Sequence, residues 1–363
     1  SMRKIVCFHL LNDYSGSPTV LRMVLLGLLG QNYKIDLVSS NGDGVLSDLC
    51  RNGDIRIYRY SYKFSTNPII AFIRYLLVQS YLFFFSFRYL FHADILFYIN
   101  TILPVGAALA GRLMGKQVVY HYHENAFAKG VFYKLLAYIM RVLATKIICV
   151  SNYQRSFLRR ERGVYIVPNA IPGSLLHNLH SCPDKAFQNK RVLMLGSLKR
   201  YKGATVFARL AKALPDYKFE LVLNETQENI NTYWRVNKLP LSANLTVYPR
   251  QQNVAPFYNR ASIVLNLTDK HYAIETFGLT ALEAMSAGLP VIVPTVGGIA
   301  EMVQDGVNGY KIDVQDFRAI VIKINHILSE KALYDKIAKG ALATASMYNE
   351  AHMCTQIESI LGE

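Results

Sequence analysis

The chain has 363 residues, of which 52% are hydrophobic and 18% are charged. This length accommodates two domains of ordinary size, and this composition excludes a disordered or low-complexity chain. Five cysteines are scattered without CxxC spacing, which excludes a disulfide framework and a zinc knuckle and favours the reducing cytoplasm. The first residues, SMRKIVCFHLLN, lack the long apolar segment of a signal peptide, so a cytoplasmic protein is expected.

The positive charge lies mainly in the first half of the chain. Residues 1–170 contain 20 Lys and Arg against 8 Asp and Glu, whereas residues 171–363 contain 20 against 17. A surface with this excess attracts phosphate groups, as found in nucleic acid, anionic lipid or a phosphorylated substrate.

The first half alternates apolar strands with helical segments. The predicted strands are residues 3–11, 33–40, 93–100, 116–123, 146–152 and 164–169. The first strand is followed by the loop YSGSP at 14–18 and by a helical pattern over 19–30. This alternation predicts a parallel sheet with helices on both faces.

Residues 68–91, PIIAFIRYLLVQSYLFFFSFRYLF, form a long apolar helical segment. Arg74, Arg88 and Gln79 argue against a membrane span, which leaves a buried core helix or a helix whose exposed flank enters the membrane interface. A basic cluster at 155–163, RSFLRRERG, adds further positive charge. We therefore predict peripheral binding of the N-terminal domain to an anionic membrane surface.

Residues 170–190 are rich in Pro, Gly, Asn and Ser and predict a linker. The alternation then resumes, with predicted strands at 191–197, 218–224, 244–249, 262–268, 289–295 and 309–313. Helices are predicted at 203–214, 254–261, 278–288, 298–304 and 315–329. The fold class is therefore α/β, with two tandem doubly wound domains and a ligand expected in the cleft between them.

Two glutamates flank a predicted helix start in the stretch IETFGLTALEAMSAGLPVIVP, residues 274–294. Backbone N–H groups at such a helix start can bind phosphate oxygens. Glu275 lies before this start and Glu283 lies within the helix, and a carboxylate can accept hydrogen bonds from two sugar hydroxyls. This pattern predicts a ligand with a central phosphate group, a nucleotide at one end and a sugar at the other.

The longer string from Glu275 to Asp313 resembles the signature of the retaining glycosyltransferase family 4, whose members have the GT-B fold of two Rossmann-like domains. The resemblance implies that Glu275 contacts the transferred sugar and that Glu283 binds the ribose hydroxyls. It also implies a substrate-binding segment in which backbone groups hold the sugar and diphosphate: Thr276, Phe277, Gly278, Leu279 and Thr280.

Residues 193–214 resemble a second family motif, in which an arginine and a lysine hold the diphosphate. Lys202 and Gly203 match, but Ser197 stands in place of the arginine, so Arg200 or Lys199 is expected to supply the second charge. Arg250, after the strand at 244–249, is expected to approach the nucleotide base.

In the first half, Gly16 and Ser17 correspond to the family's glycine-rich first loop, and His123 with Glu124 to a strand-end motif. His121 and His123 share a strand face, so the pattern HYHE also fits a metal site or two structural histidines. ICVSN and VPNAIP resemble the closing turns of the family's first domain, whose Ser151 and Asn169 would line the cleft or act as a cap and a turn.

The resemblance implies transfer of a hexose or N-acetylhexosamine from a UDP-, GDP- or ADP-sugar, with the anomeric configuration retained. Lys202 and the amides at 278–280 would stabilise the departing diphosphate, while His123 and Glu275 would act on the sugar. No two aspartates show the D-x-D spacing, so no metal or other cofactor is expected. The expected acceptor is a glycan or a polyprenyl-diphosphate-linked glycan of bacterial polysaccharide synthesis, at the inner face of the cytoplasmic membrane.

The predicted domains are residues 1–172, joined by a C-terminal helix at about 345–363, and residues 173–344. A nucleotide-sugar epimerase of the same fold is one alternative. A basic nucleic-acid-binding protein is another, although no recognition module is visible and nucleic acid is not the expected partner.

Overall fold

The computed structural model describes residues 3–126, 129–199 and 202–363. The chain forms two compact units, one of Ser1–Asn169 with Glu350–Glu363 and one of Ala170–Asn349. The sequence placed this division at residue 172 and the return to the first unit at about residue 345. Each unit is an α/β domain with its own parallel sheet.

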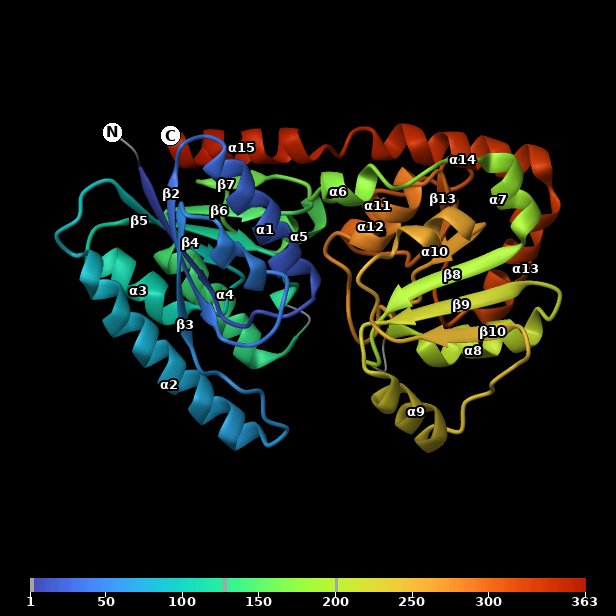
Figure 1. Ribbon diagram of the computed structural model, residues 1–363, viewed down its shortest axis with the longest axis horizontal. Coiled ribbons are helices and arrows are strands. Elements are labelled where there is room, and N and C mark those ends of the chain that lie inside the picture. The colour runs from blue at the N-terminus through green and yellow to red at the C-terminus, as the bar shows by residue number, and fades with distance from the viewer. Residues whose placement is uncertain (1–2, 127–128, 200–201) are drawn as a thin grey trace. The chain divides into compact units, whose positions relative to one another are not determined.

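Unit 1 is built on a seven-stranded parallel sheet with the strand order β3-β2-β1-β4-β5-β6-β7 (Figure 1). Its strands are β1 (Lys4–His9), β2 (Lys34–Ser40), β3 (Ile55–Tyr60), β4 (Ile95–Asn100), β5 (Gln117–Tyr122), β6 (Lys146–Cys149) and β7 (Val164–Ile166). Most positions in the central strands are buried because helices cover both faces of the sheet.

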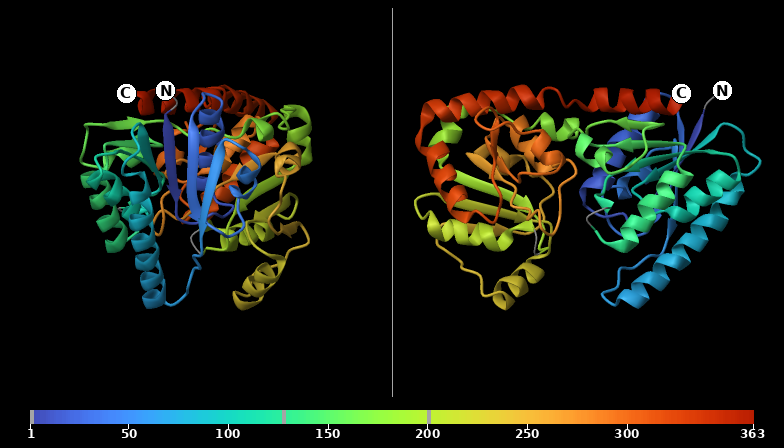
Figure 2. Two further views of the ribbon diagram at one scale, coloured as in Figure 1. Left: turned by 60° about the vertical axis from the view of Figure 1, so that its left-hand side comes forward. Right: turned by 180° about the vertical axis from the view of Figure 1, so that it is seen from behind.

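The helices of unit 1 are α1 (Gly16–Leu29), α2 (Pro68–Ser86), α3 (Val105–Leu113), α4 (Val131–Leu143), α5 (Asn152–Ser156) and α15 (Glu350–Gly362), with 3-10 turns η1 (Ser47–Arg51) and η2 (Phe87–Tyr89). From β1 the chain adds β2 and β3 on one side, and it then returns to add β4 and the later strands on the other side of β1. Because the crossovers are right-handed, this reversal places α2, α3 and α4 on the opposite face of the sheet from α1. Accordingly, α2 packs on α3 and α3 on α4, while α1 packs on α15 (Figures 1 and 2).

Unit 2 is built on a six-stranded parallel sheet with the order β10-β9-β8-β11-β12-β13. Its strands are β8 (Arg191–Gly196), β9 (Lys218–Leu223), β10 (Leu245–Tyr248), β11 (Ile263–Leu265), β12 (Val291–Val293) and β13 (Gly309–Lys311). Its helices are α6 (Gly173–Leu176), α7 (Pro183–Asn189), α8 (Ala204–Ala213), α9 (Gln227–Val236), α10 (Ala255–Arg260), α11 (Leu279–Ser286), α12 (Gly298–Glu301), α13 (Phe317–Ser329) and α14 (Lys331–Ala345).

Some elements differ from the sequence-based expectation. The edge strand β3, IRIYRY, was not predicted, because as an edge strand it buries only its first and last residues. Short helices α6 and α7 lie in the predicted linker, and α9 was also missed. The C-terminal helix expected at about 345–363 is α15, which begins at Glu350 and belongs to unit 1. The Lys146 ammonium donates to the Ile360 carbonyl of α15 at 2.6 Å.

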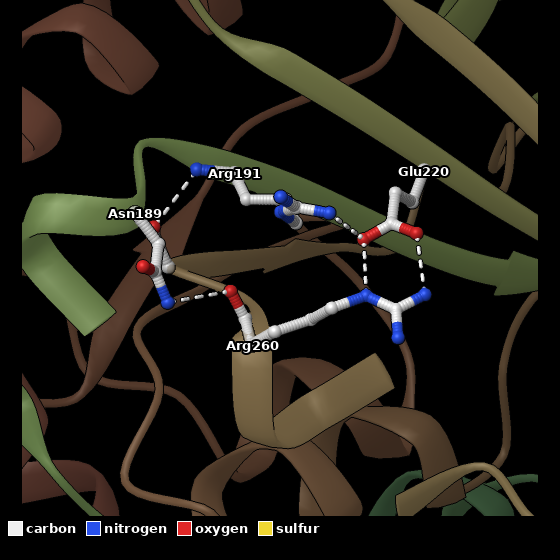
Figure 3. A network of polar contacts seen from close by, with 5 residues as sticks. Asn189, Arg191, Glu220 and Arg260 are labelled. Carbon is white, nitrogen blue, oxygen red and sulfur yellow. Dashed lines mark hydrogen bonds and ion pairs between the residues drawn. The ribbon is translucent and has the colours of Figure 1, made fainter. Parts of the chain in front are cut away.

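A buried ion-pair network joins three elements of unit 2 (Figure 3). The Glu220 carboxylate on β9 is only 3% exposed and lies 2.8 Å from the Arg191 guanidinium and 2.7 Å from that of Arg260. Burial alone would raise the pKa of Glu220, but hydrogen bonds and charge from the two arginines lower it to about 2. The network therefore fixes β8, β9 and the end of α10 together.

Candidate active site

The candidate site of unit 2 lies where the strand order of its sheet reverses. Strands β8 and β11 are neighbours, and the chain leaves them toward opposite sides of the sheet. Ligands of open α/β sheets bind outside the carboxyl ends of the strands at such a point. The loop after β8 carries the basic motif, and the chain after β11 carries the paired glutamates, Glu275 in a loop and Glu283 in α11.

Lys202 and Glu275, far apart in sequence, form an ion pair at this edge of unit 2. The Thr268 hydroxyl also donates to the Glu275 carboxylate, at 2.9 Å. Burial would raise the pKa of Glu275, but the Lys202 charge and the surrounding hydrogen bonds hold that pKa below its ordinary value. Glu275 is therefore an ionised carboxylate next to an ammonium group.

Two glycines allow other backbone segments to pack closely around this pair, Gly203 in the loop after β8 and Gly297 in the loop after β12. Gly203 has φ 87° and a side chain there would come within 2.4 Å of the Leu267 Cβ atom. Gly297 has φ 103° and a side chain there would come within 2.5 Å of the Glu275 carbonyl oxygen. Because neither position has room for a Cβ atom, glycine is required at both.

Glu283 lies in α11, and its carboxylate accepts a hydrogen bond from the Tyr258 hydroxyl on α10. Burial raises the pKa of Glu283 to about 7, against the lowering effect of this hydrogen bond. Glu275 and Glu283 thus have different electrostatic surroundings: the first has a cationic partner and the second has a neutral phenol.

The other predicted residues of unit 2 lie around the same edge. Gly278 precedes the first turn of α11, which contains Leu279 and Thr280, and Thr276 is half-buried. Phe277 is buried and its ring packs edge-on against that of Tyr348.

The basic motif is described only in part. Ser197 directly follows β8, and its hydroxyl has no hydrogen-bond partner among the described residues. Arg200, predicted to supply a second charge, lies outside the described residues. Arg250 follows β10, where its backbone N–H donates to the Glu225 carbonyl at 3.0 Å.

A cavity of about 570 Å³ adjoins the start of α8 in unit 2, with Gly203, Arg209 and Asp269 in its lining. Asp269, His271 and Asp313 beside it could offer one metal ligand atom each, all within 4.8 Å of one another. The Asp313 carboxylate already pairs with Lys270 at 3.1 Å, and the side chain of His271 is exposed. These groups were not singled out from the sequence.

Unit 1 has its own cluster where β1, β4 and β5 end. The Asn100 side chain bridges two histidines, with its nitrogen 3.0 Å from His9 Nδ1 and its oxygen 2.9 Å from His123 Nε2. An amide can make both bonds only if His9 accepts at Nδ1 and His123 donates from Nε2. Burial lowers the pKa of both histidines, to about 4 for His9, so the cluster is neutral near pH 7.

His121 and Glu124 complete the predicted HYHE pattern. The His121 ring lies 4.1 Å from that of His123 and its Nδ1 lies 2.5 Å from the Tyr98 hydroxyl. One Glu124 oxygen accepts from the Ile102 N–H at 3.3 Å, and burial raises the pKa of this carboxyl. The three side chains do not form a metal-ligand cluster in the part of the chain that the structure describes.

The remaining predictions in unit 1 concern turns. Gly16 and Ser17 are not in a loop but in the first turn of α1, because the helix begins one residue after Ser15. The Ser17 carbonyl still faces the cluster and accepts from the Asn100 side chain at 3.4 Å. Ser151 caps α5 by accepting from the Gln154 N–H at 3.2 Å, and Asn169 is buried.

Sequence reasoning missed His9, Asn100 and Tyr258. His9 and Asn100 are the last residues of β1 and β4, and the rule that ligands bind at a switch point would indicate both once the strand order is known. Tyr258 lies in α10 and carries no sequence signal, because only the tertiary structure brings it to Glu283.

Two family models match the chain, one in each half. The model "Glycosyltransferase Family 4" matches residues 14–173, and the model "Glycosyl transferases group 1" matches residues 183–343. Together they extend over most of the sequence.

Curated relatives match over shorter stretches. A D-inositol 3-phosphate glycosyltransferase of Nocardioides sp. is 35% identical over 82 residues, which are 23% of this chain and 18% of the relative. An N-acetyl-alpha-D-glucosaminyl L-malate synthase of Bacillus anthracis is 32% identical over 115 residues, which are 32% of this chain and 29% of the relative. The matched stretches thus span less than a third of these relatives' length.

Solved structures match over the whole chain. Anabaena Alr3699/HepE, in complex with UDP and glucose, has a TM-score of 0.79 at 18% identity and covers 99% of this chain and 100% of its own. Sucrose-phosphate synthase from Thermosynechococcus elongatus has a TM-score of 0.79 at 17% identity and covers 98% of both chains. At these identities the likeness establishes the fold, which is that of the GT-B glycosyltransferases.

Proposed function

Because the chain belongs to the family-4 type of glycosyltransferases, we propose that it transfers a hexose or N-acetylhexosamine from a nucleotide-diphosphate sugar to an acceptor hydroxyl. The observation that carries this proposal is the pairing of Lys202 with Glu275 beside the start of α11. The cation and the helix amides suit a diphosphate, and the adjacent carboxylate suits sugar hydroxyls.

The family assignment also bears on the alternatives. A nucleic-acid-binding protein had only the net charge in its favour, whereas an epimerase of the same fold would not be expected to carry the paired-glutamate string. The transferase reading uses both motifs of unit 2.

In the proposed reaction, the bond between the anomeric carbon and the diphosphate oxygen breaks while the sugar becomes oxocarbenium-like. Negative charge then grows on the leaving diphosphate, where the Lys202 ammonium and the amides of residues 278–280 would stabilise it. The acceptor hydroxyl would attack from the same side, pass its proton to the leaving phosphate and so retain the anomeric configuration. Protein groups supply the positive charge, so we propose a reaction without a metal ion.

Unit 1 would hold the acceptor. His123, oriented by Asn100, presents a neutral ring at the carboxyl edge of its sheet. A neutral hydroxyl needs hydrogen-bonding groups rather than a strong field, which fits this cluster. We propose a glycan or polyprenyl-diphosphate-linked acceptor and a role in bacterial polysaccharide synthesis at the inner face of the cytoplasmic membrane.

The donor is proposed to be a UDP-sugar, since Anabaena Alr3699/HepE has been solved with UDP and with UDP-glucose. A thermal-shift panel of UDP, GDP, ADP and CMP tests this choice. A nucleotide at 100 times its dissociation constant should stabilise the native state by about 2.7 kcal/mol. We expect the largest shift with UDP, with or without divalent metal.

Two variants make the panel specific for the site. Glu283→Gln should reduce the thermal shift, because a neutral amide is a weaker acceptor than a carboxylate for the two ribose hydroxyls. Glu228→Gln, an exposed position on α9, should keep it. If no nucleoside diphosphate stabilises the wild type, the proposed donor site is wrong.

A further inference from the structure

Helix α2 exposes an unusual amount of apolar surface. With η2 it spans Pro68–Tyr89, a segment that by length and composition alone could cross a membrane, and only about a third of its apolar 18-residue window is buried in the protein. Its buried side packs on α3, where the Gln79 side chain accepts from the Gly106 N–H at 2.9 Å. The opposite side leaves Leu77 65% exposed and Phe84 72% exposed.

The apolar surface continues across two further helices of the same unit. On α3, Leu109 and Leu113 are exposed, and on α4, Leu135 and Val142 are exposed. Between α2 and α4 lies a groove of about 540 Å³ with almost entirely apolar walls. The helices lie side by side on one face of the sheet (Figure 2), and we call this surface the α2–α3–α4 face.

The charges on this face have one sign. Its three helices contain Arg74, Arg112, Lys134 and Arg141 and no acidic residue. In the surrounding chain, residues 55–160 contain only two acidic residues, Asp94 and Glu124. An apolar surface with only cations complements a layer of apolar chains beneath anionic headgroups.

This charge pattern argues against a second copy of the chain as the occupant. In a two-fold symmetric contact the same surface meets itself, so the four cations of one copy would face those of the other. The described residues of unit 2 form no comparable surface, since their exposed large apolar side chains are spread over separate elements.

The face also lies next to the candidate acceptor site. Helix α4 starts shortly after His123 and Glu124, at the carboxyl edge of the sheet. Phe132 in its first turn contacts Tyr75 of α2, with ring centroids 5.4 Å apart. A bilayer on this face would therefore lie beside the edge of unit 1 that carries the histidine cluster.

We propose that the α2–α3–α4 face docks on an anionic phospholipid bilayer, with its apolar side chains inserted among the acyl chains and its basic side chains among the headgroups. The proposal concerns unit 1 alone and needs no donor.

The test is flotation of the purified full-length chain with vesicles of phosphatidylcholine alone or with added phosphatidylglycerol. We expect the wild type to float with the anionic vesicles. The double variant Leu77→Ser, Phe84→Ser should stay at the bottom of the gradient. The matched control Val236→Ser, Leu241→Ser removes apolar side chains of unit 2 that are 68% and 72% exposed, and it should float like the wild type.

A second pair of variants tests the electrostatic part. Arg74→Gln with Lys134→Gln should weaken partitioning into anionic vesicles about 30-fold, because each basic residue near such a surface contributes about a fivefold gain. Lys185→Gln with Lys212→Gln, both exposed in unit 2, should have little effect.

Three outcomes would overturn the proposal. The wild type could fail to float with anionic vesicles, or the Leu77, Phe84 variant could float equally well. Sedimentation without vesicles could instead show a dimer that this variant abolishes, which would assign the face to self-association. The nucleotide panel depends on unit 2, so failure of the donor proposal would be seen separately.

Discussion

The two units anchor their sheets in the same way at the amino ends of the strands. In unit 1, Lys4 at the start of β1 pairs with Asp36, the third residue of β2, at 2.9 Å. In unit 2, Arg191 at the start of β8 pairs with Glu220, the third residue of β9, at 2.8 Å. Both carboxylates are buried, so each pair fixes the two strands that its sheet is built around.

At the carboxyl ends the two units differ. Unit 2 presents the ion pair of Lys202 and Glu275, whereas unit 1 presents the neutral cluster of His9, Asn100 and His123. A charged edge suits a ligand that carries a diphosphate, and a neutral edge suits a hydroxyl. This difference fits the proposed roles of unit 2 in binding the donor and of unit 1 in binding the acceptor hydroxyl.

The largest expected effect comes from removing the cation of unit 2. Lys202→Met should lower the rate at which UDP is released from the UDP-sugar by about 10²–10³-fold, because the leaving diphosphate loses one preorganised ammonium group that stabilises its negative charge. Lys212→Met, on the exposed side of α8, is the control and should keep the wild-type rate. A decrease of less than tenfold for Lys202→Met would contradict the proposed role.

The anchoring pair of unit 2 should matter for stability rather than for activity. Glu220→Gln should reduce the free energy of unfolding by about 3 kcal/mol at neutral pH, because two arginines lose their buried partner. Since folding lowers the pKa of Glu220 from 4.5 to about 2, this stabilisation should be lost as the pH falls from about 4.5 to 2. Urea unfolding over this pH range measures it.

An exposed ion pair of unit 1 provides the comparison for that variant. The Asp48 carboxylate lies 2.7 Å from the Arg22 guanidinium, but its side chain is 51% exposed. Asp48→Asn should therefore cost less than about 1 kcal/mol. Equal costs for the two variants would show that burial of Glu220 is not the cause of its effect.

In unit 1, the neutral cluster should affect turnover without affecting nucleotide binding. Asn100→Ala removes the groups that orient His9 and His123, so we expect kcat to fall by about tenfold or more, while the thermal shift caused by UDP stays unchanged. Asn41→Ala, at an exposed position after β2, is the control. A loss of the UDP response in Asn100→Ala would mean that unit 1 is not confined to the acceptor.

The smallest effect concerns the pH dependence of donor binding. With a pKa of about 7, Glu283 is largely protonated at pH 6 and largely ionised at pH 8. UDP affinity should rise about tenfold over this range, because the carboxylate form accepts both ribose hydroxyls. In Glu283→Gln, the UDP affinity should change with pH only through titration of the nucleotide itself. Calorimetry with the wild type and the variant separates this contribution from that of Glu283.

The sequence by itself determined the fold class, because hydrophobic periodicity specifies buried strands and covering helices, and the signature strings identified the family. It also located Lys202, Glu275 and Glu283, whose motifs are local in sequence. It did not reveal β3, because an edge strand that buries only its two ends gives a weak pattern. Arg200 lies outside the described residues, so its expected role in holding the diphosphate remains a prediction.

Only the tertiary structure decided which of these groups meet. Lys202 reaches Glu275 because β8 and β11 are neighbours and because Gly203, which has no Cβ atom, lets the loop after β8 pack closely on Leu267 after β11. In the same way, Asn100 joins His9 to His123 because β1, β4 and β5 end at one edge. The order of strands in a sheet depends on packing between distant segments, and a periodic pattern within one segment carries no information about it.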